Sequence, residues 1–202
     1  SPAYRACDFP GLMRQVGFDS IWSGEHHTTD GFHFWPLLPM LQRLAAETEG
    51  LELGTNIVLL PLHNPVEMAE ICAFLDVISG GRFNLGVGLG YRPEEFDYLD
   101  VPYKERGARF AESLQLMTKL WTQETVNHEG RFWQLHDVHP HIQPVQQPYP
   151  PIWIGAHAEA GVRRAGRYGD AYACPPETPV PEVARRYAIV RDMFAQRGKA
   201  FG

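Results

Sequence analysis

Short apolar runs alternate with amphipathic segments along most of this chain, and that alternation restricts the fold more than any other feature. Five runs have the composition of buried strands: 20–24, 51–60, 83–90, 152–156 and 171–174. The spacing of apolar residues predicts helices at 36–49, 65–79, 105–121, 158–168 and 182–197. Strands that alternate with helices form βαβ units, and strands that are apolar throughout are covered on both faces. The sequence therefore predicts an α/β fold with a parallel sheet, either doubly wound or closed into a (β/α)₈ barrel.

Residues 122–151 interrupt this alternation within what we predict to be a single domain over residues 1–202. The segment contains five prolines, at positions 140, 144, 148, 150 and 151. Proline ends helices and removes a backbone donor, so this excursion is expected to be a long loop or a hairpin.

Charge and composition exclude several classes of protein. Lys and Arg number 18 against 24 Asp and Glu, and the resulting charge of −6 argues against a nucleic-acid-binding face. No run approaches the roughly 20 apolar residues that span a bilayer, and the first residues lack a signal-peptide pattern. Cys7, Cys72 and Cys174 are too sparse for a disulfide framework, so we expect reduced thiols in a cytoplasmic protein.

The tripeptide Glu25-His26-His27 directly follows the first predicted strand. Functional residues of parallel α/β folds gather at the carboxyl ends of strands, where an imidazole can act as a general base. Adjacent histidines cannot share one helix face, so this is not a zinc-binding helix of the HExxH type. The alternative is that these polar residues cap the strand and the following loop.

A glycine-rich strand end is formed by Gly86, Gly88 and Gly90, with Tyr91 after them. Glycines at a strand end allow a ring or a phosphate to approach the backbone, although this spacing differs from the G-x-G-x-x-G dinucleotide motif. Close packing of small residues inside a barrel is the alternative.

Two further motifs have a weaker signal. His136, His139 and His141 lie in the excursion, where a polar loop is favoured over the metal site of a barrel hydrolase. We therefore predict no metal ligands. The segment 155–158 ends a strand just before a helix, whose N-terminus is a candidate phosphate site.

Several ordered segments together resemble the bacterial luciferase-like monooxygenase family. They are GFDSIWSGEHH, LELGTNIVLLPLHNPVEMAE, LDVISGGRFNLGVGLGYRPEEF and VPYKERGARFAESLQLMTKLW. The resemblance implies a TIM-barrel variant that uses reduced FMN and O₂ to oxygenate a small organic substrate, with a separate flavin reductase. F420-dependent hydride transfer and a non-catalytic subunit are the alternatives.

The resemblance also implies roles for individual residues. His26 would assist chemistry at the flavin with Glu25 beside it, and a non-proline cis peptide or bulge would lie at Asn56 and Ile57. Trp22, Phe34, Trp35 and Tyr91 are candidate apolar walls. The remaining predicted cofactor-binding residues are Gly88, Leu89, Gly90, Tyr91, Ala156, His157 and Ala158.

Two departures weaken the predicted phosphate contacts. Many members of the family carry Arg at the position of Leu89, and Ser or Thr at the positions of Ala158 and Gly161. Leucine, alanine and glycine side chains cannot bind phosphate through charge or a hydroxyl. Arg92 and Arg163 are candidate substitutes.

The length of 202 residues is short for this fold, since a (β/α)₈ barrel typically has about 250. The five predicted strands correspond to strands two to six of eight, so we expect an incomplete barrel truncated at both ends. The family dimerises through helices, which here would be 36–49 and 65–79. We therefore expect a homodimer. Met68, Cys72 and Leu75 are a candidate apolar outer stripe, and core packing is the favoured alternative for at least some of them.

Overall fold

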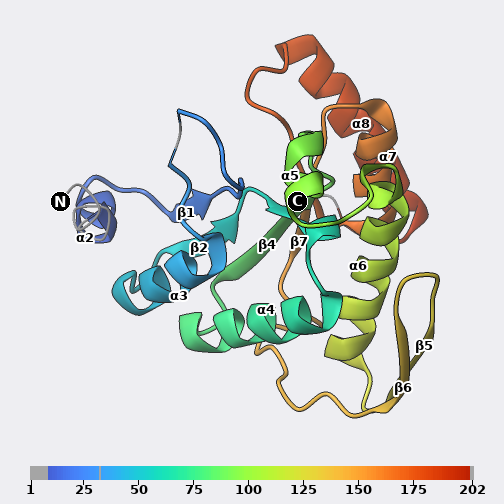
Figure 1. Ribbon diagram of the computed structural model, residues 1–202. Helices are drawn as coiled ribbons and strands as arrows, with labels where there is room; N and C mark the ends of the chain where they lie inside the picture. The colour runs from blue at the N-terminus through green and yellow to red at the C-terminus, as the bar shows by residue number, and fades with distance from the viewer. Residues whose placement is uncertain (1–8, 32, 201–202) are drawn as a thin grey trace.

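A parallel sheet runs through the centre of the computed structural model, which describes residues 9–31 and 33–200 (Figure 1). Its strand order is β1-β2-β4-β7-β8, with β3 paired beside β4, and every pairing in it is parallel. The strands are β1 (Ser20–Ser23), β2 (Glu52–Thr55), β3 (Val58–Leu59), β4 (Phe83–Gly88), β7 (Ile152–Gly155) and β8 (Ala171–Ala173). The predicted parallel α/β fold is confirmed.

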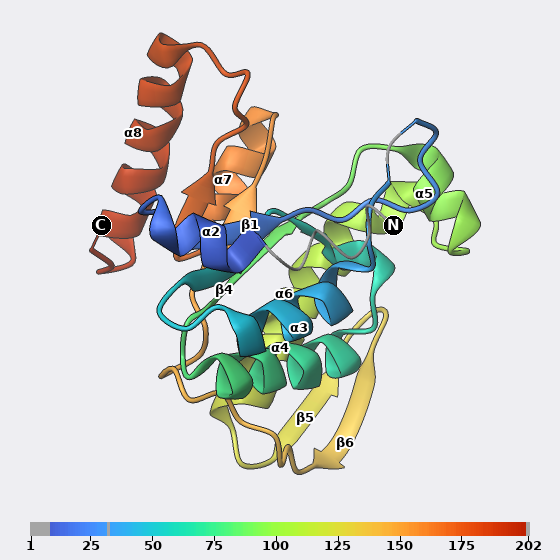
Figure 2. The ribbon, with the colours of Figure 1, turned by 90° about the vertical axis from the view of Figure 1, so that its left-hand side faces the viewer.

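Helices surround the sheet in chain order, with α3 packed on α4, α4 on α6 and α7 on α8 (Figures 1 and 2). The helices are α2 (Phe9–Gln15), α3 (Leu37–Glu47), α4 (Pro65–Ser79), α5 (Pro93–Tyr98), α6 (Arg106–Thr122), α7 (Glu159–Tyr168) and α8 (Val180–Gln196), with short 3₁₀ turns η2 (Leu60–Leu62) and η3 (Tyr103–Glu105). The predicted helices are present within about two residues, since apolar periodicity is a local signal. The six-residue α5 is too short for that signal and was not predicted.

Local sequence signals set the ends of α4. The Asn64 side chain accepts a hydrogen bond from the Val66 N–H, and Pro65 begins the helix. Gly80 follows in the left-handed conformation, with φ of 67°, and ends the helix. β4 is buried along its whole length, so both faces of this strand are covered, as its apolar composition predicted.

The predicted strand 51–60 is two strands in the structure. β2 ends at Thr55, opposite Ser23 of β1, whereas β3 begins at Val58, opposite Val87 of β4. The cis peptide expected from the resemblance lies between them, at Asn56–Ile57. The prediction of one continuous strand was wrong because the ladder is interrupted at Asn56 and Ile57: β2 pairs with both β1 and β4, whereas β3 pairs with β4 alone. Apolar composition does not record this interruption.

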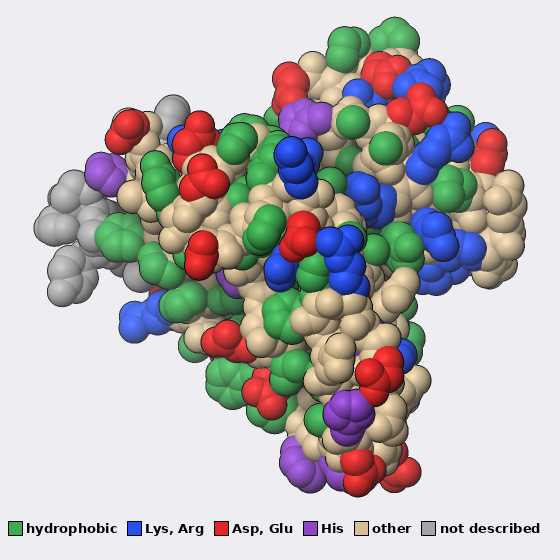
Figure 3. All heavy atoms as spheres, turned by 45° about the vertical axis from the view of Figure 1, so that its right-hand side comes forward, with side chains coloured by type: hydrophobic (Ala, Val, Ile, Leu, Met, Phe, Trp, Pro, Cys, Tyr) green, Lys and Arg blue, Asp and Glu red, His purple; other side chains and the backbone are tan. Residues whose placement is uncertain are grey.

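The excursion contains the antiparallel hairpin β5 (Val126–Glu129) and β6 (Gln134–Val138), which extends away from the sheet beyond α4 and α6 (Figure 2). Figure 3 shows histidine side chains at this lower end of the molecule. His136 pairs with Glu129 on the neighbouring strand, and His139 lies against Asp137. No group of metal-ligand atoms forms from the hairpin in the part of the chain that the structure describes.

The carboxylate of Glu112 on α6 holds this hairpin. It accepts hydrogen bonds from the backbone N–H groups of Arg131, Phe132 and Trp133, at 2.9 to 3.2 Å. Burial alone would raise the pKa of Glu112, but these N–H groups and His128 more than offset that effect and lower it below its usual 4.5. A carboxyl group whose pKa is lower in the folded than in the unfolded state stabilises the folded state at pH values above its ordinary pKa. This stabilisation is lost as the pH falls through the lowered pKa.

Replacing Glu112 by alanine is expected to reduce the opening free energy of the hairpin by about 2 kcal/mol, since three backbone donors lose a charged acceptor. In the wild type, acidification below about pH 4.5 is expected to produce the same loosening. Amide hydrogen exchange at Phe132 and Trp133 measures both effects. Glu129→Gln, at an exposed position of the same hairpin, is the control. Unchanged exchange in Glu112→Ala would show that the hairpin does not depend on this carboxylate.

The structure confirms core packing, and not an outer stripe, for the three apolar residues singled out on α4. Met68, Cys72 and Leu75 are buried in the core, because this face of α4 packs against the sheet and the neighbouring helices. The exposed apolar side chains of α4 are instead Phe74, Val77 and Ile78.

Two of the three cysteines lie in the described part of the chain. Cys72 and Cys174 are both free thiols, and burial, with Asp76 nearby, raises the pKa of Cys72. Cys7 lies outside the described residues.

The two edge strands of the sheet, β1 and β8, do not pair with each other. β1 pairs only with β2, and β8 pairs only with β7, among the residues described. This arrangement is part of a barrel rather than a closed one. None of the helices in residues 9–31 and 33–200 is long and apolar enough to cross a bilayer.

Candidate active site

His26 lies just beyond the carboxyl end of β1 and is held by Glu95 of α5. Its Nδ1 is 2.8 Å from Glu95 Oε1, and the same oxygen accepts the His27 backbone N–H at 3.0 Å. Glu95 is almost fully buried, with 1% of its surface exposed. Because a carboxylate only accepts hydrogen bonds, Nδ1 carries the proton and Nε2 of His26 is left available for a ligand. Sequence reasoning missed Glu95, which lies within the quoted motif GYRPEEF.

Aromatic rings surround His26 at this end of the sheet. Phe34 lies edge-on with its ring centroid 4.8 Å from that of His26, and Tyr91 lies 5.8 Å away. Tyr91 in turn is 6.4 Å from His157, which follows β7. The structure thus brings together predicted site residues from the ends of three strands, β1, β4 and β7.

A cavity of about 290 Å³ adjoins His26. Its lining residues come from the segment after β1: His26, Thr28, Thr29, His33, Phe34 and Trp35. Phe34, Trp35 and Tyr91 expose 43%, 52% and 64% of their surface. A cluster of exposed aromatic side chains around one imidazole is typical of a ligand site rather than of a solvated surface. The fourth predicted wall residue, Trp22, packs instead against Trp153, with ring centroids 5.2 Å apart.

Glu25 belongs to a second cluster. Its Oε2 accepts the Leu59 N–H at 2.7 Å, and both carboxylate oxygens lie 3.0 Å from His63 Nε2. His27 Nε2 is 3.4 Å from Glu25 Oε1. Burial alone would raise the pKa of Glu25, but His27, His63 and the Leu59 N–H outweigh it and lower the pKa from 4.5 to about 2. The same contact with Glu25 raises the pKa of His27.

The tripeptide Glu25-His26-His27 is therefore divided between two clusters. Successive side chains of an extended chain point to opposite sides, so positions 25 and 27 face one way and position 26 the other. His26 contacts Glu95, whereas Glu25 and His27 contact His63. The predicted catalytic pair Glu25 and His26 does not form one unit.

The glycine-rich strand end accommodates side chains of the chain itself. A Cβ at Gly88 would overlap the Ile57 side chain, and one at Gly90, where φ is 75°, would lie 2.9 Å from the Phe96 ring. Leu89 is half-buried and packs against the core. These contacts support the packing alternative for the glycines.

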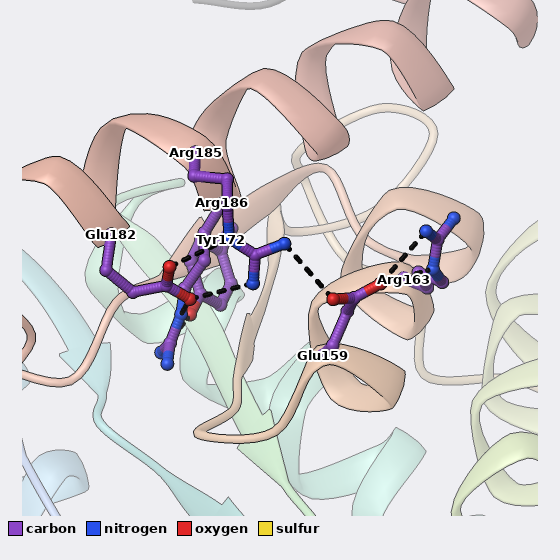
Figure 4. A network of polar contacts seen from close by, with 6 residues as sticks. All are labelled: Glu159, Arg163, Tyr172, Glu182, Arg185 and Arg186. Carbon is purple, nitrogen blue, oxygen red and sulfur yellow. Dashed lines mark hydrogen bonds and ion pairs between the residues drawn. The ribbon is translucent and has the colours of Figure 1, made fainter.

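The N-terminus of α7 is the remaining predicted site. Ala158 is its N-cap and provides no side-chain hydrogen bond, so the first N–H groups of the helix have no side-chain cap. Glu159 in the first turn is bound by Arg163 and Arg185, which balance its charge (Figure 4). His157 pairs with Glu177 at 3.1 Å.

The strong ion pairing around Glu159 extends onto α8. Glu182 binds both Arg185 and Arg186, and Arg186 reaches the Tyr172 hydroxyl at 3.3 Å (Figure 4). Figure 3 shows acidic and basic side chains interspersed over this part of the surface. Arg163 is bound to Glu159. The structure therefore gives no support to the prediction that Arg163 takes the place of the family's phosphate-binding arginine.

Parallel strands covered by helices, with polar side chains at their carboxyl ends, place the chain in the α/β-barrel class, whose members have their sites at that end of the barrel. The sequence profile described as luciferase-like monooxygenase matches residues 8–202. The chain belongs to this family.

Relatives of the chain have two kinds of activity. It is 31% identical over 204 residues to the 4-hydroxyprotoasukamycin monooxygenase of Streptomyces nodosus subsp. asukaensis, covering 97% of this chain and 55% of the relative. It is 34% identical over 178 residues to the F420-dependent glucose-6-phosphate dehydrogenase of Kineococcus radiotolerans, covering 84% of this chain and 52% of the relative. The crystal structure of monooxygenase RslO1 from Streptomyces bottropensis superposes with a TM-score of 0.90 at 27% identity, covering 98% of this chain and 61% of that one.

The chain spans about half the length of these curated relatives. Together with the open sheet, this confirms that the described residues form part of a luciferase-like barrel. The relatives named here divide between a monooxygenase and an F420-dependent dehydrogenase, so membership of the family does not select the cofactor.

Proposed function

We propose that the protein containing this chain is a flavin-dependent monooxygenase that uses reduced FMN and O₂ to oxygenate a small organic substrate. The observation that carries the proposal is His26, whose Nδ1 is held by the buried Glu95 while exposed aromatic rings surround it. An oriented imidazole beside a flat apolar surface suits a planar redox cofactor and a proton-transfer step.

The residues present fit the ring of such a cofactor better than its phosphate. Phe34, Trp35 and Tyr91 offer apolar surface beside His26, next to the cavity. At the predicted phosphate end, Leu89, Ala158 and Gly161 offer neither charge nor a hydroxyl. Backbone N–H groups at the start of α7 are the donors that would hold the phosphate there.

Each part of the site then has a physical role. Bound reduced flavin supplies the electrons for oxygen activation. His26 holds or moves a proton at Nε2, and Glu95 fixes the orientation of its ring. Phe34 and Tyr91 exclude water from the reacting atoms.

F420-dependent hydride transfer is the second candidate function. The absence of polar side chains at Leu89, Ala158 and Gly161 removes contacts expected to hold the FMN phosphate, which weakens the case for FMN. The 34% sequence identity with the Kineococcus dehydrogenase is the observation that favours F420. Failure to bind either cofactor would favour a non-catalytic subunit.

Titration of the full-length protein with reduced FMN and with reduced F420 tests the choice. We expect FMN to bind more tightly by at least tenfold, or about 1.4 kcal/mol. We expect His26→Ala to lower substrate oxygenation about a hundredfold, since a positioned acid or base contributes that much or more. His139→Ala, on the hairpin, is the control. Tighter F420 binding, or full activity in His26→Ala, would contradict the monooxygenase proposal.

The proposal includes a separate flavin reductase and a homodimer, both of which the family resemblance implies. The oxygenation assay is therefore run with a flavin reductase and its nicotinamide donor. Light scattering on the same sample gives the number of chains per particle. Phe74, Val77 and Ile78 on the outer face of α4 are the apolar surface that a second copy would cover.

A further inference from the structure

Glu25, His27 and His63 bring one carboxylate and two imidazoles together beside the His26 site. One ligand atom from each residue lies within 4.8 Å of the others. Glu25 is 3.0 Å from His63 Nε2 and 3.4 Å from His27 Nε2. In the part of the chain that the structure describes, this is the only group of three such side chains that converges in this way.

These distances match the spacing of ligands around a small cation. Bonds of about 2.0 to 2.1 Å to a tetrahedral Zn²⁺ place neighbouring ligand atoms about 3.3 Å apart. Two of the separations in the cluster, 3.0 and 3.4 Å, are close to this value. The ligand atoms of the third pair, His27 and His63, lie within 4.8 Å of each other.

The cluster is already oriented by the backbone around it. The Leu59 N–H donates to Glu25 Oε2 at 2.7 Å, which fixes the carboxylate plane. Glu95 accepts the backbone N–H of His27, and His63 follows the turn η2, where its own N–H donates to the Leu60 carbonyl. Backbone and carboxylate partners of this kind orient metal ligands.

His27 provides a further observation that points to a missing partner. Its Nε2 atom is buried from solvent and makes no hydrogen bond of good geometry, although Glu25 Oε1 lies 3.4 Å away. A buried nitrogen without a hydrogen bond has a free-energy cost that a bound ion would remove.

A cavity of about 370 Å³ lies against all three side chains, and Trp35, Pro36 and Leu38 also line it. Coordination positions that the protein does not fill would face this space. Three protein ligands with an open side are typical of zinc sites that admit water or a ligand, whereas structural sites are closed by four.

We propose that Glu25, His27 and His63 bind one first-row divalent transition ion, with its remaining coordination positions open to this cavity. Two imidazole nitrogens and one carboxylate oxygen favour ions such as Zn²⁺ and Co²⁺ over Mg²⁺ or Ca²⁺, which prefer oxygen ligands. The proposal does not depend on the cofactor assigned to the His26 site.

Zn²⁺ titration of the metal-stripped full-length protein, without flavin or F420, tests this site. We expect one Zn²⁺ per chain, and Co²⁺ in its place is expected to give the visible absorption of a low-coordinate N/O site. His27→Ala, His63→Ala and Glu25→Gln are each expected to weaken Zn²⁺ binding at least tenfold. Glu25→Gln keeps an acceptor for the Leu59 N–H, which limits its effect on folding.

The matched control is a variant of the other histidine-rich segment, in which alanine replaces His136, His139 and His141. We expect this variant to bind Zn²⁺ as the wild type does. Loss of binding in the control, or full binding in His27→Ala and His63→Ala, would overturn the proposal. Absence of stoichiometric Zn²⁺ binding in the wild type would show that the cluster is a hydrogen-bonded group only.

A measurement on the wild type tests the site even if the variants fail to fold. Acylation of histidines by diethyl pyrocarbonate, read by mass spectrometry, is compared with and without Zn²⁺. We expect Zn²⁺ to protect His27 and His63 and to leave His139 and His157 unchanged. Equal modification of His27 and His63 in both samples would overturn the proposed site.

Discussion

Replacing Glu95 by glutamine is expected to lower turnover of the full-length protein about a hundredfold, while cofactor binding changes only a few-fold. Glutamine keeps the size of the side chain, and its oxygen in the place of Oε1 can still accept both the His26 Nδ1–H and the His27 N–H. It carries no negative charge, so the imidazolium that forms when His26 takes a proton at Nε2 loses its charged partner. The variant therefore keeps the imidazole in place and removes the charge that supports proton transfer.

Steady-state kinetics with saturating reduced cofactor and O₂ measure this effect as a fall in kcat with little change in KM. Glu94→Gln is the matched control, because Glu94 is the exposed neighbour on the same helix. If Glu95→Gln kept wild-type turnover, or if Glu94→Gln lost as much, the role of the Glu95 charge beside His26 would be wrong.

Replacing Gly86 by alanine is expected to destabilise the fold by about 3 kcal/mol or more. A Cβ at this position would overlap the backbone carbonyl oxygen of Thr55, which no side-chain rotation can relieve. Thr55 Oγ1 also accepts the Gly86 N–H at 2.8 Å and donates to the Gly86 carbonyl at 2.7 Å. A shift of β4 away from β2 would break both bonds in the centre of the sheet.

Denaturant unfolding of the two proteins measures the difference in the free energy of unfolding. Gly107→Ala in α6 is the control, since the nearest atom to its added Cβ, Arg164 Nη2, is 3.9 Å away. Alanine is the better helix former, so this control is expected to be neutral or slightly more stable. Equal stability of Gly86→Ala and the wild type would show that β2 and β4 are not packed as described.

Most of the fold was predictable because its signals are local. The apolar runs at 83–90 and 152–156 are strands, and the periodic segments 65–79 and 105–121 are helices within about two residues. Proline at the start of α4 and glycine after its end act on their immediate neighbours, so they could be recognised without a structure.

The candidate site was only partly predictable, because its contacts join distant segments. His26 and Glu95 are 69 positions apart, and the short α5 that carries Glu95 has no periodic signal. Glu25 and His63 are 38 positions apart and meet only because β1 and β3 end at the same edge of the sheet. The resemblance identified Asn56 and Ile57 as the position of the cis peptide, whereas the strand pattern alone placed one continuous strand there.

The sequence by itself determined the parallel α/β class, the luciferase-like family and the placement of polar residues after the strands, since all of these follow from short-range patterns and ordered motifs. The tertiary structure alone decided how those polar residues are partnered. Glu25, His26 and His27 are consecutive in the chain, but their side chains alternate in direction, and the elements that meet each side come from later in the chain. His26 therefore joins Glu95, while Glu25 and His27 join His63.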